Sequence, residues 1–174
     1  EQMIIKELIT DEKLRLFYDI NKQLTPFELY EVSQRIKDIT TAFPPVKSIY
    51  LYRVTDNLVL TTNAMVTLES FADRAFVKEV MSQPMTTWTN SRQYQELEGA
   101  PHIMNVVSLA KQVPLGSGSQ GLLVVNVLTS SFYEMFNHLS ETNVFINLSD
   151  SHNQLLFGES VPSGKQLSEV KSSY

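Results

Sequence analysis

Cysteine is absent from this chain of 174 residues. Structural disulfides, thiolate metal sites and a cysteine nucleophile are therefore excluded. Because a cytosolic protein of this length usually keeps some cysteine, the absence favours an exported protein of a Gram-positive-like organism.

Long apolar runs are missing too, since no stretch approaches the ~18 consecutive apolar residues of a membrane span. The first residues, EQMIIKELITDEK, lack the basic-then-apolar layout of a signal peptide. We expect membrane attachment only through segments outside this chain.

Clusters of positive charge are also lacking. The chain carries 14 Lys and Arg against 19 Asp and Glu, which gives a net charge of −5, and no basic run exceeds two residues. A protein that binds the phosphate backbone of nucleic acids needs clustered positive charge. We therefore expect this region to contact no nucleic acid.

Motifs for catalysis or metal binding are sparse. His102, His138 and His152 are the only histidines, and they lie in separate segments without the i, i+4 spacing of a metal site. The Gly/Ser run 115–121 (LGSGSQG) has a strand behind it instead of a helix N-terminus, so it reads as a hairpin loop and not as a phosphate-binding loop. No G-x-S-x-G pattern occurs. The sequence predicts no catalytic residue, no metal site, no cofactor and no enzyme activity.

Two helices are expected at the N-terminus. Residues 1 to about 23 show an apolar stripe with a break or a new cap near Thr10-Asp11. Residues 25–28 (TPFE) form a capping box with proline at the first helical position, and Pro44-Pro45 ends the second helix. Its stripe (Leu29, Val32, Ile36, Ile39, Phe43) suits packing on a sheet better than a coiled-coil dimer seam, because it spans only about two heptads.

Alternating apolar residues predict strands after these helices. Val46–Val54 and Leu58–Thr62 form a hairpin around residues 55–57, with Ile49, Leu51 and Arg53 on one face and Tyr50, Tyr52 and Val54 on the other. We expect a helix over 63–82, a short strand over 86–89 and a loop over 90–100. Two antiparallel strands and a helix (about 130–139) occupy residues 101–139, followed by a hairpin over 143–158 and a tail after Glu159. This order predicts an α+β fold with an antiparallel sheet and the long helices on one face.

Several segments in this order resemble the Cache family of extracellular PAS-like sensor domains. They are the helix pair ending at IYLYR, the hairpin into LVLTTN, the helix at FADRAFVKEV, a short strand bearing Trp88, and the strands VVSLAKQVP and GLLVVNVLTSSFYEMF. The likeness is greatest to the double-Cache sensors of bacterial membrane-anchored transcription regulators of the AraC type. It implies that residues 1–140 form a membrane-distal PAS-like lobe with N-terminal helices, and that residues 141–174 begin a second, truncated membrane-proximal lobe.

The resemblance also implies a small-molecule site on the concave face of the distal sheet. The matching residues are Tyr50, Tyr52, Trp88, Arg92, Ser108 and Asn126. Members that bind amino acids carry an Arg shortly before a Trp-Tyr pair and a later Asp. This chain lacks the Trp-Tyr pair and has Trp88 before Arg92, so an amino-acid ligand is not implied.

The side chains themselves leave alternatives open. Trp88 suits an aromatic platform for a ligand or core packing against the 71–80 helix. Arg53 and Arg92 suit a carboxylate fork or a solvated surface. Lys111 points away from the site if Ser108 and Ala110 face it, and into the site in the opposite register. Asn147-Leu148-Ser149 matches a glycosylation sequon that a bacterial domain would not normally use.

Two functions follow from these observations. The leading hypothesis is a non-catalytic extracellular domain that senses a small molecule and transmits the signal through its N-terminal helix. The alternative is a structural module without a ligand, in which the N-terminal helices form a homodimer.

Overall fold

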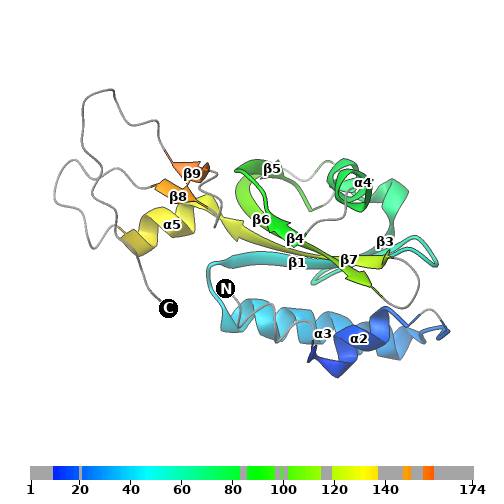
Figure 1. Cartoon of the computed structure of the whole chain (residues 1–174). Helices are drawn as coiled ribbons and strands as arrows, with labels where there is room; N and C mark the ends of the chain where they lie inside the picture. The colour runs from blue at the N-terminus through cyan, green and yellow to red at the C-terminus, as the bar shows by residue number, and fades with distance from the viewer. Residues whose placement is uncertain are drawn as a thin grey trace, which may run out of the picture.

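A computed structural model describes residues 10–19, 21–82, 86–96, 99, 102–114, 119–136, 147–149 and 155–158 (Figure 1). Its elements are α2 (Glu12–Phe17), α3 (Pro26–Ala42), β1 (Val46–Arg53), β2 (Leu58–Thr61), β3 (Met65–Thr67), the 3-10 turn η1 (Leu68–Ser70), α4 (Arg74–Ser82), β4 (Thr86–Trp88), β5 (Arg92–Tyr94), β6 (Met104–Pro114), β7 (Ser119–Leu128), α5 (Thr129–Phe136), β8 (Asn147–Ser149) and β9 (Leu155–Gly158). Within this part of the chain, no helix is long and apolar enough to cross a membrane.

The two N-terminal helices begin where the sequence predicts caps. Asp11 caps α2, with its side chain accepting hydrogen bonds from the backbone of Lys13 and Leu14 at 3.0 and 3.2 Å. Thr25 caps α3 in a complete capping box: its hydroxyl accepts from the Glu28 N–H at 3.2 Å, and the Glu28 carboxylate accepts from the Thr25 N–H at 2.9 Å. Both predicted starts are confirmed. Residues 1–9 lie outside the described part of the chain.

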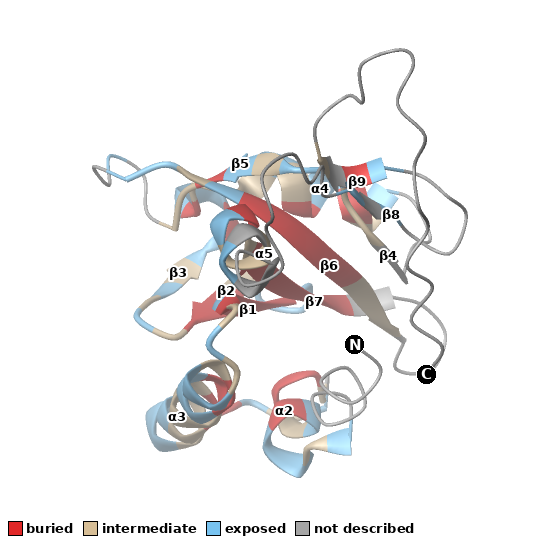
Figure 2. Cartoon of the chain, turned by 90° about the vertical axis from the view of Figure 1, so that its left-hand side faces the viewer, coloured by how far each residue is buried: buried red, intermediate tan, exposed pale blue. Residues whose placement is uncertain are grey.

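A seven-stranded antiparallel sheet forms the centre of the molecule. Its order is β3-β2-β1-β7-β6-β4, and β5 also pairs with β6. Burial is concentrated in β1, β6 and β7 (Figure 2). Helices α2 and α3 cover one face of the sheet, which we call the α3 face, and α4 lies over the other, the α4 face (Figure 1). The predicted α+β class, with the long N-terminal helices on one face of an antiparallel sheet, is confirmed.

The alternation of β1 gives each face its own core. Ile49 and Leu51 pack on the α3 face with the buried residues of α3, whereas Tyr50 and Tyr52 pack on the α4 face. The residues of the α3 stripe that are fully buried are Val32, Ile36 and Ile39. The stripe therefore packs on the sheet of its own chain, as predicted, and is not available as a coiled-coil seam.

Helix α2 is fixed to one end of the sheet. The Tyr18 hydroxyl, just after α2, donates a hydrogen bond to the Leu122 carbonyl at 2.9 Å. Gly121 makes room for this contact, because a Cβ at that position would overlap the Tyr18 ring and the Tyr52 carbonyl oxygen. From the opposite strand, the Arg53 side chain donates to the Phe17 carbonyl at 3.2 Å and lies over the Phe17 ring.

Two segments differ from the sequence prediction. The expected helix over 63–82 begins only at Arg74, because Met65–Thr67 pairs with β2 as an edge strand. The expected loop over 90–100 contains β5, in which Arg92 pairs with Val106 and Tyr94 with Met104. Both strands have three residues, which is too short for alternation to stand out from the polar residues around them.

A second, two-stranded sheet is formed by β8 and β9, which confirms the predicted hairpin. The Ser91 N–H, next to β5, donates a hydrogen bond to the Leu156 carbonyl of β9 at 2.8 Å. The tail after Glu159 and most residues from 137 onward lie outside the described part of the chain. The division into lobes at 1–140 and 141–174 therefore stays a prediction.

Candidate functional site

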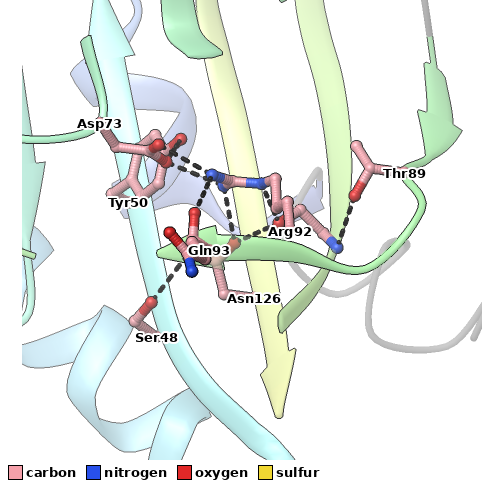
Figure 3. Close-up of polar contacts among 8 residues, drawn as sticks. Ser48, Tyr50, Asp73, Thr89, Arg92, Gln93 and Asn126 are labelled. Carbon is pink, nitrogen blue, oxygen red and sulfur yellow. Dashed lines mark hydrogen bonds and ion pairs between the residues drawn. The ribbon is translucent and has the colours of Figure 1, made fainter. Parts of the chain in front are cut away.

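A group of polar side chains lies in the middle of the α4 face, surrounded by apolar and aromatic residues. We call it the α4-face cluster, and Figure 3 shows it. Its members come from four strands and from the residue before α4: Ser48 and Tyr50 (β1), Arg92 (β5), Ser108 (β6), Asn126 (β7) and Asp73.

Strand register brings the cluster together. Asn126 pairs with Ser48 on one side and with Ser108 on the other, so three short polar side chains lie abreast across β1, β7 and β6. Tyr50 shares their face because it lies two residues after Ser48 on the same strand. β5 adds Arg92 above Ser108, since the Arg92 Nε–H donates to the Ser108 hydroxyl at 2.8 Å.

Arg92 is the centre of the cluster. Its guanidinium binds the Asp73 carboxylate through two hydrogen bonds, Nη1 to Oδ1 at 2.7 Å and Nη2 to Oδ2 at 2.8 Å. The remaining N–H groups donate to Ser108, to the Asn126 Oδ1 at 3.2 Å and to the Gln93 carbonyl at 3.5 Å. The Phe76 ring of α4 stacks against the guanidinium, with its centroid 3.7 Å from the central carbon. Every N–H group of this side chain therefore has a partner within the protein.

The Asp73 carboxylate is almost as buried as the apolar residues around it. Its side chain is 9% exposed and that of Arg92 is 16% exposed. Tyr50 supplies a third hydrogen bond, from its hydroxyl to the Asp73 Oδ2 at 2.8 Å. Burial raises the pKa of Asp73, while the hydrogen bonds and charge of Arg92 and the Tyr50 hydroxyl oppose that rise. Burial also raises the pKa of Tyr50, so its phenol stays protonated as the donor.

The amide of Asn126 connects the two sides of the cluster. Its oxygen accepts from the Ser108 hydroxyl at 2.6 Å, and its nitrogen donates to the Ser48 hydroxyl at 3.0 Å. The Ser108 N–H donates in turn to the Thr89 hydroxyl at 3.0 Å (Figure 3). A buried amide held by three neighbours has one orientation only, which fixes the position of the Arg92 fork.

Tyr94 is the exception to this full pairing. Its ring stacks parallel to Tyr50 at 6.3 Å between centroids, and the residue is only 1% exposed. Among the described residues, its hydroxyl is the one buried side-chain polar atom without a hydrogen-bond partner. Burial raises the pKa of Tyr94, and the Ser48 hydroxyl lies near enough to oppose the rise in part without meeting the geometry of a hydrogen bond. A buried phenol with a free donor is costly unless something else binds to it.

The structure brings four of the six residues implied by the resemblance into the cluster: Tyr50, Arg92, Ser108 and Asn126. Tyr52 shares the face, but its hydroxyl donates to Asn57 in the β1–β2 turn at 3.1 Å. The role of these residues in ligand binding stays a prediction.

Trp88 lies elsewhere. It pairs with Leu109 on β6 and packs against the core of the α3 face, on the other side of the sheet from the cluster. Its expected place beside the site is wrong, and so is the alternative of packing against the 71–80 helix. The physical reason is the register of β4, which sets Trp88 beside Leu109, a residue whose side chain packs on the α3 face.

Other polar residues also take definite positions. Arg53 is buried on the α3 face and pairs with Asp56, so neither a ligand fork nor a solvated surface describes it. Ala110 packs on the α4 face with Ser108, and Lys111 pairs with Leu123 of the α3 face. Of the two registers that the sequence left open, the structure thus has the one that turns Lys111 away from the cluster. His102 is exposed, while His138 and His152 lie outside the described residues. Within those residues, no group of three metal-ligating side chains occurs.

Sequence reasoning missed Asp73, Ser48 and Tyr94. Ser48 could have been found from strand alternation, because it lies two residues from Tyr50 on the same predicted strand. Tyr94 escaped because β5 was expected to be a loop. Asp73 precedes a helix, where an acidic residue ordinarily reads as a cap.

No family model matches the sequence, and no curated protein is detectably similar to it. Solved structures do match in fold. The extracellular domain of vpHK1S-Z8, named as a histidine kinase, has 11% identity and a TM-score of 0.56, over 78% of this chain and 52% of that one. The sensory domain of the Campylobacter jejuni chemoreceptor Tlp3, solved with isoleucine bound, has 14% identity and a TM-score of 0.53, over 90% and 59%.

A third match is a domain named as part of a sensory box/GGDEF family protein from Vibrio parahaemolyticus. It has 10% identity and a TM-score of 0.58, over 96% of this chain and 65% of that one. The chain thus spans between about half and two thirds of these structures. At such identities the matches establish the fold, which this chain shares with sensory domains of chemoreceptors and histidine kinases.

Proposed function

We propose that this chain is the extracellular sensing region of a bacterial membrane-anchored signalling protein and binds a small molecule at the α4-face cluster. The shared fold with extracellular and sensory domains supports the class of protein. The resemblance noted in the sequence further suggests a transcription regulator as the output, with the signal leaving through the N-terminal helix. In this proposal the chain has no catalytic role.

The observation that carries the proposal is the buried, polar centre of the α4 face. A buried ion pair is seldom more stabilising than well-packed apolar residues of the same volume, so stability alone does not account for an Arg–Asp pair at this position. Charged groups that are desolvated and precisely oriented occur preferentially at functional sites. The unpaired hydroxyl of Tyr94 lies at the same face and offers a donor to a ligand.

Charge balance limits the ligand class. Arg92 and Asp73 together are neutral, so a ligand with one net charge would leave a buried, unbalanced charge as long as both side chains keep their positions. A small polar molecule that is neutral, or that carries both a carboxylate and an ammonium group, preserves the balance. The isoleucine bound to the Tlp3 domain belongs to the second kind.

Thermal unfolding with a metabolite panel tests the proposal. The panel should include zwitterions, monocarboxylates, amines and neutral sugars, and a ligand at 100 times its Kd should add about 2.7 kcal/mol to the free energy of unfolding. Tyr94→Phe is the informative variant. Because it removes a hydroxyl that has no partner, we expect the free protein to be as stable as the wild type or more so. The ligand-induced shift should shrink. A panel without any hit, or a hit that Tyr94→Phe leaves unchanged, argues against this site.

A structural module that dimerises through its N-terminal helices is the second candidate. The internal pairing of every Arg92 N–H favours it, because such a site is complete without a ligand. Since the α3 stripe packs on the sheet, a dimer would use the outer face of α3, where Phe27 and Tyr30 are 68% and 59% exposed. Sedimentation distinguishes the two: a tight dimer that responds to no ligand favours this candidate, and a monomer at high concentration opposes it.

A further inference from the structure

We infer that Asp73 is a built-in competitor of the ligand: its carboxylate occupies the Arg92 fork, and a ligand carboxylate takes its place and releases the start of α4. The inference rests on the proposed function, because it describes the regulation of the same site. It assigns to Asp73 a role that neither the sequence nor the shared fold provides.

The contacts of Asp73 are those of a bound carboxylate. Both oxygens receive a hydrogen bond from the Arg92 guanidinium in the parallel, bidentate arrangement, and Tyr50 donates to one of them. Arg–carboxylate forks of this kind are among the strongest polar contacts in proteins. A free carboxylate of similar size would find the same three donors in the same places.

The two partners of this fork belong to different parts of the molecule. Arg92 is held by the sheet, through Ser108 on β6 and Asn126 on β7. Asp73 belongs to the first turn of α4, where its carbonyl accepts from the Val77 N–H at 3.2 Å. When a ligand carboxylate replaces Asp73 on the guanidinium, Arg92 therefore stays in place and α4 moves.

Helix α4 is attached to the sheet differently at its two ends. At its start, both Asp73 and the Phe76 ring contact the Arg92 guanidinium. At its end, the Gln112 side chain of β6 donates to the Val80 carbonyl at 2.6 Å, and Val80 is buried. Loss of the Asp73 contact loosens the first turn, which keeps the Phe76 ring against Arg92, while the last turn remains attached. The expected motion is a rotation of α4 about its C-terminal end.

Replacement of the Asp73 carboxylate by that of a ligand also explains how a buried site can respond to a ligand. A displaced Asp73 cannot stay desolvated without a cation, so it must reach either water or an ammonium group of the ligand. The first turn of α4 therefore differs between the free and bound states. A ligand shifts a conformational equilibrium only if it has different affinities for the two states, and the exchange provides that difference.

The variant Asp73→Asn tests the inference with acetate as the probe. Asn keeps the size of Asp but leaves the Arg92 charge unpaired, so a small carboxylate should now bind. We expect sodium acetate, compared with sodium chloride at the same ionic strength, to raise the Tm of Asp73→Asn in a saturable manner, with at least tenfold tighter binding than to the wild type. The matched control is Asp38→Asn on the exposed surface of α3, which should respond like the wild type. Adding Arg92→Gln to Asp73→Asn should abolish the response.

If Asp73→Asn fails to fold, an NMR titration of the wild-type protein with acetate tests the inference instead. Molar acetate should shift the Arg92 Nε–H resonance together with amides of residues 74–82, whereas amides of α3 should not respond. An equal acetate response in the wild type and Asp73→Asn, a response that persists without Arg92, or unshifted α4 amides would overturn the inference. A metabolite panel without hits opposes the proposed function instead, and it leaves the acetate result as it stands.

Discussion

Arg53 and Arg92 both place a guanidinium against a carboxylate, but each belongs to a different face of the sheet. Arg53 binds Asp56 and the Phe17 carbonyl, so it fixes α2 to the β1–β2 turn. Arg92 binds Asp73, so it fixes α4 to the centre of the sheet. Both guanidinium groups thus attach a helix to the sheet, and that of Arg92 also lies at the centre of the candidate binding site.

Glu28 makes the stability of the fold depend on pH. Hydrogen bonds from Lys22 and Thr25 lower the pKa of Glu28 to about 2. Because the pKa is lower in the folded state than in the unfolded chain, this stabilisation is present above about pH 4.3 and is lost as the pH falls towards 2. Glu28→Gln should remove this part of the pH dependence. The measurement is the Tm between pH 2 and pH 5, where the wild-type and variant curves should converge at the acid end; parallel curves would contradict the assignment.

Single residues also show where sequence reasoning ends. The capping residue Thr25 and the face assignment of Tyr50 were predictable, because both follow from local geometry. Trp88 was not, because a three-residue strand gives no alternation to read and either face accepts an indole. The role of Asp73 could not be predicted without the path of the chain after β3, because that path brings Asp73 against Arg92, which lies nineteen positions later in the sequence.

At the scale of elements, α3 has one face that the fold needs and one that it does not. Ile36 is fully buried against the sheet, whereas Phe27 is largely exposed on the same helix. Ile36→Ala should lower the free energy of unfolding by about 3 kcal/mol, since it leaves a cavity in a packed core. Phe27→Ala, the control, should change it by no more than about 0.5 kcal/mol. Chemical denaturation measures both; a large loss in Phe27→Ala would instead point to a dimer through the outer face.

Elements differed in how well the sequence predicted them. The signals for α3, β1, β6 and β7 were strong, because caps, prolines and long alternating runs all agree there. β3 and β5 were missed, since each gains its stability from pairing with a longer neighbour and not from its own residues. The missed strand β5 carries Arg92 and Tyr94, so this gap affected the candidate site more than the fold.

At the scale of the whole molecule, the sheet separates two cores. A ligand at the α4-face cluster would lie across the sheet from Trp88, which packs with the α3 face. Trp88→Phe should therefore keep the ligand-induced shift in Tm, and the fluorescence of the wild-type tryptophan should show no quenching by contact with the ligand. Titration with any hit from the panel tests both. Loss of binding in Trp88→Phe, with the fold intact by circular dichroism, would place the ligand on the other face.

The position of β1 in the sheet has a consequence for the growing polypeptide. One edge of β1 pairs with β2, which follows immediately in sequence. The other edge pairs with β7, far along the chain, where Tyr50 lies opposite Val124. Until β7 has been synthesised, the nascent chain carries an unpaired strand edge rich in apolar residues, which favours association with other chains. Pairing of two strands so far apart in sequence is slow. We therefore expect folding to begin late in translation, with a requirement for chaperone protection that a protein built from local pairs would not have.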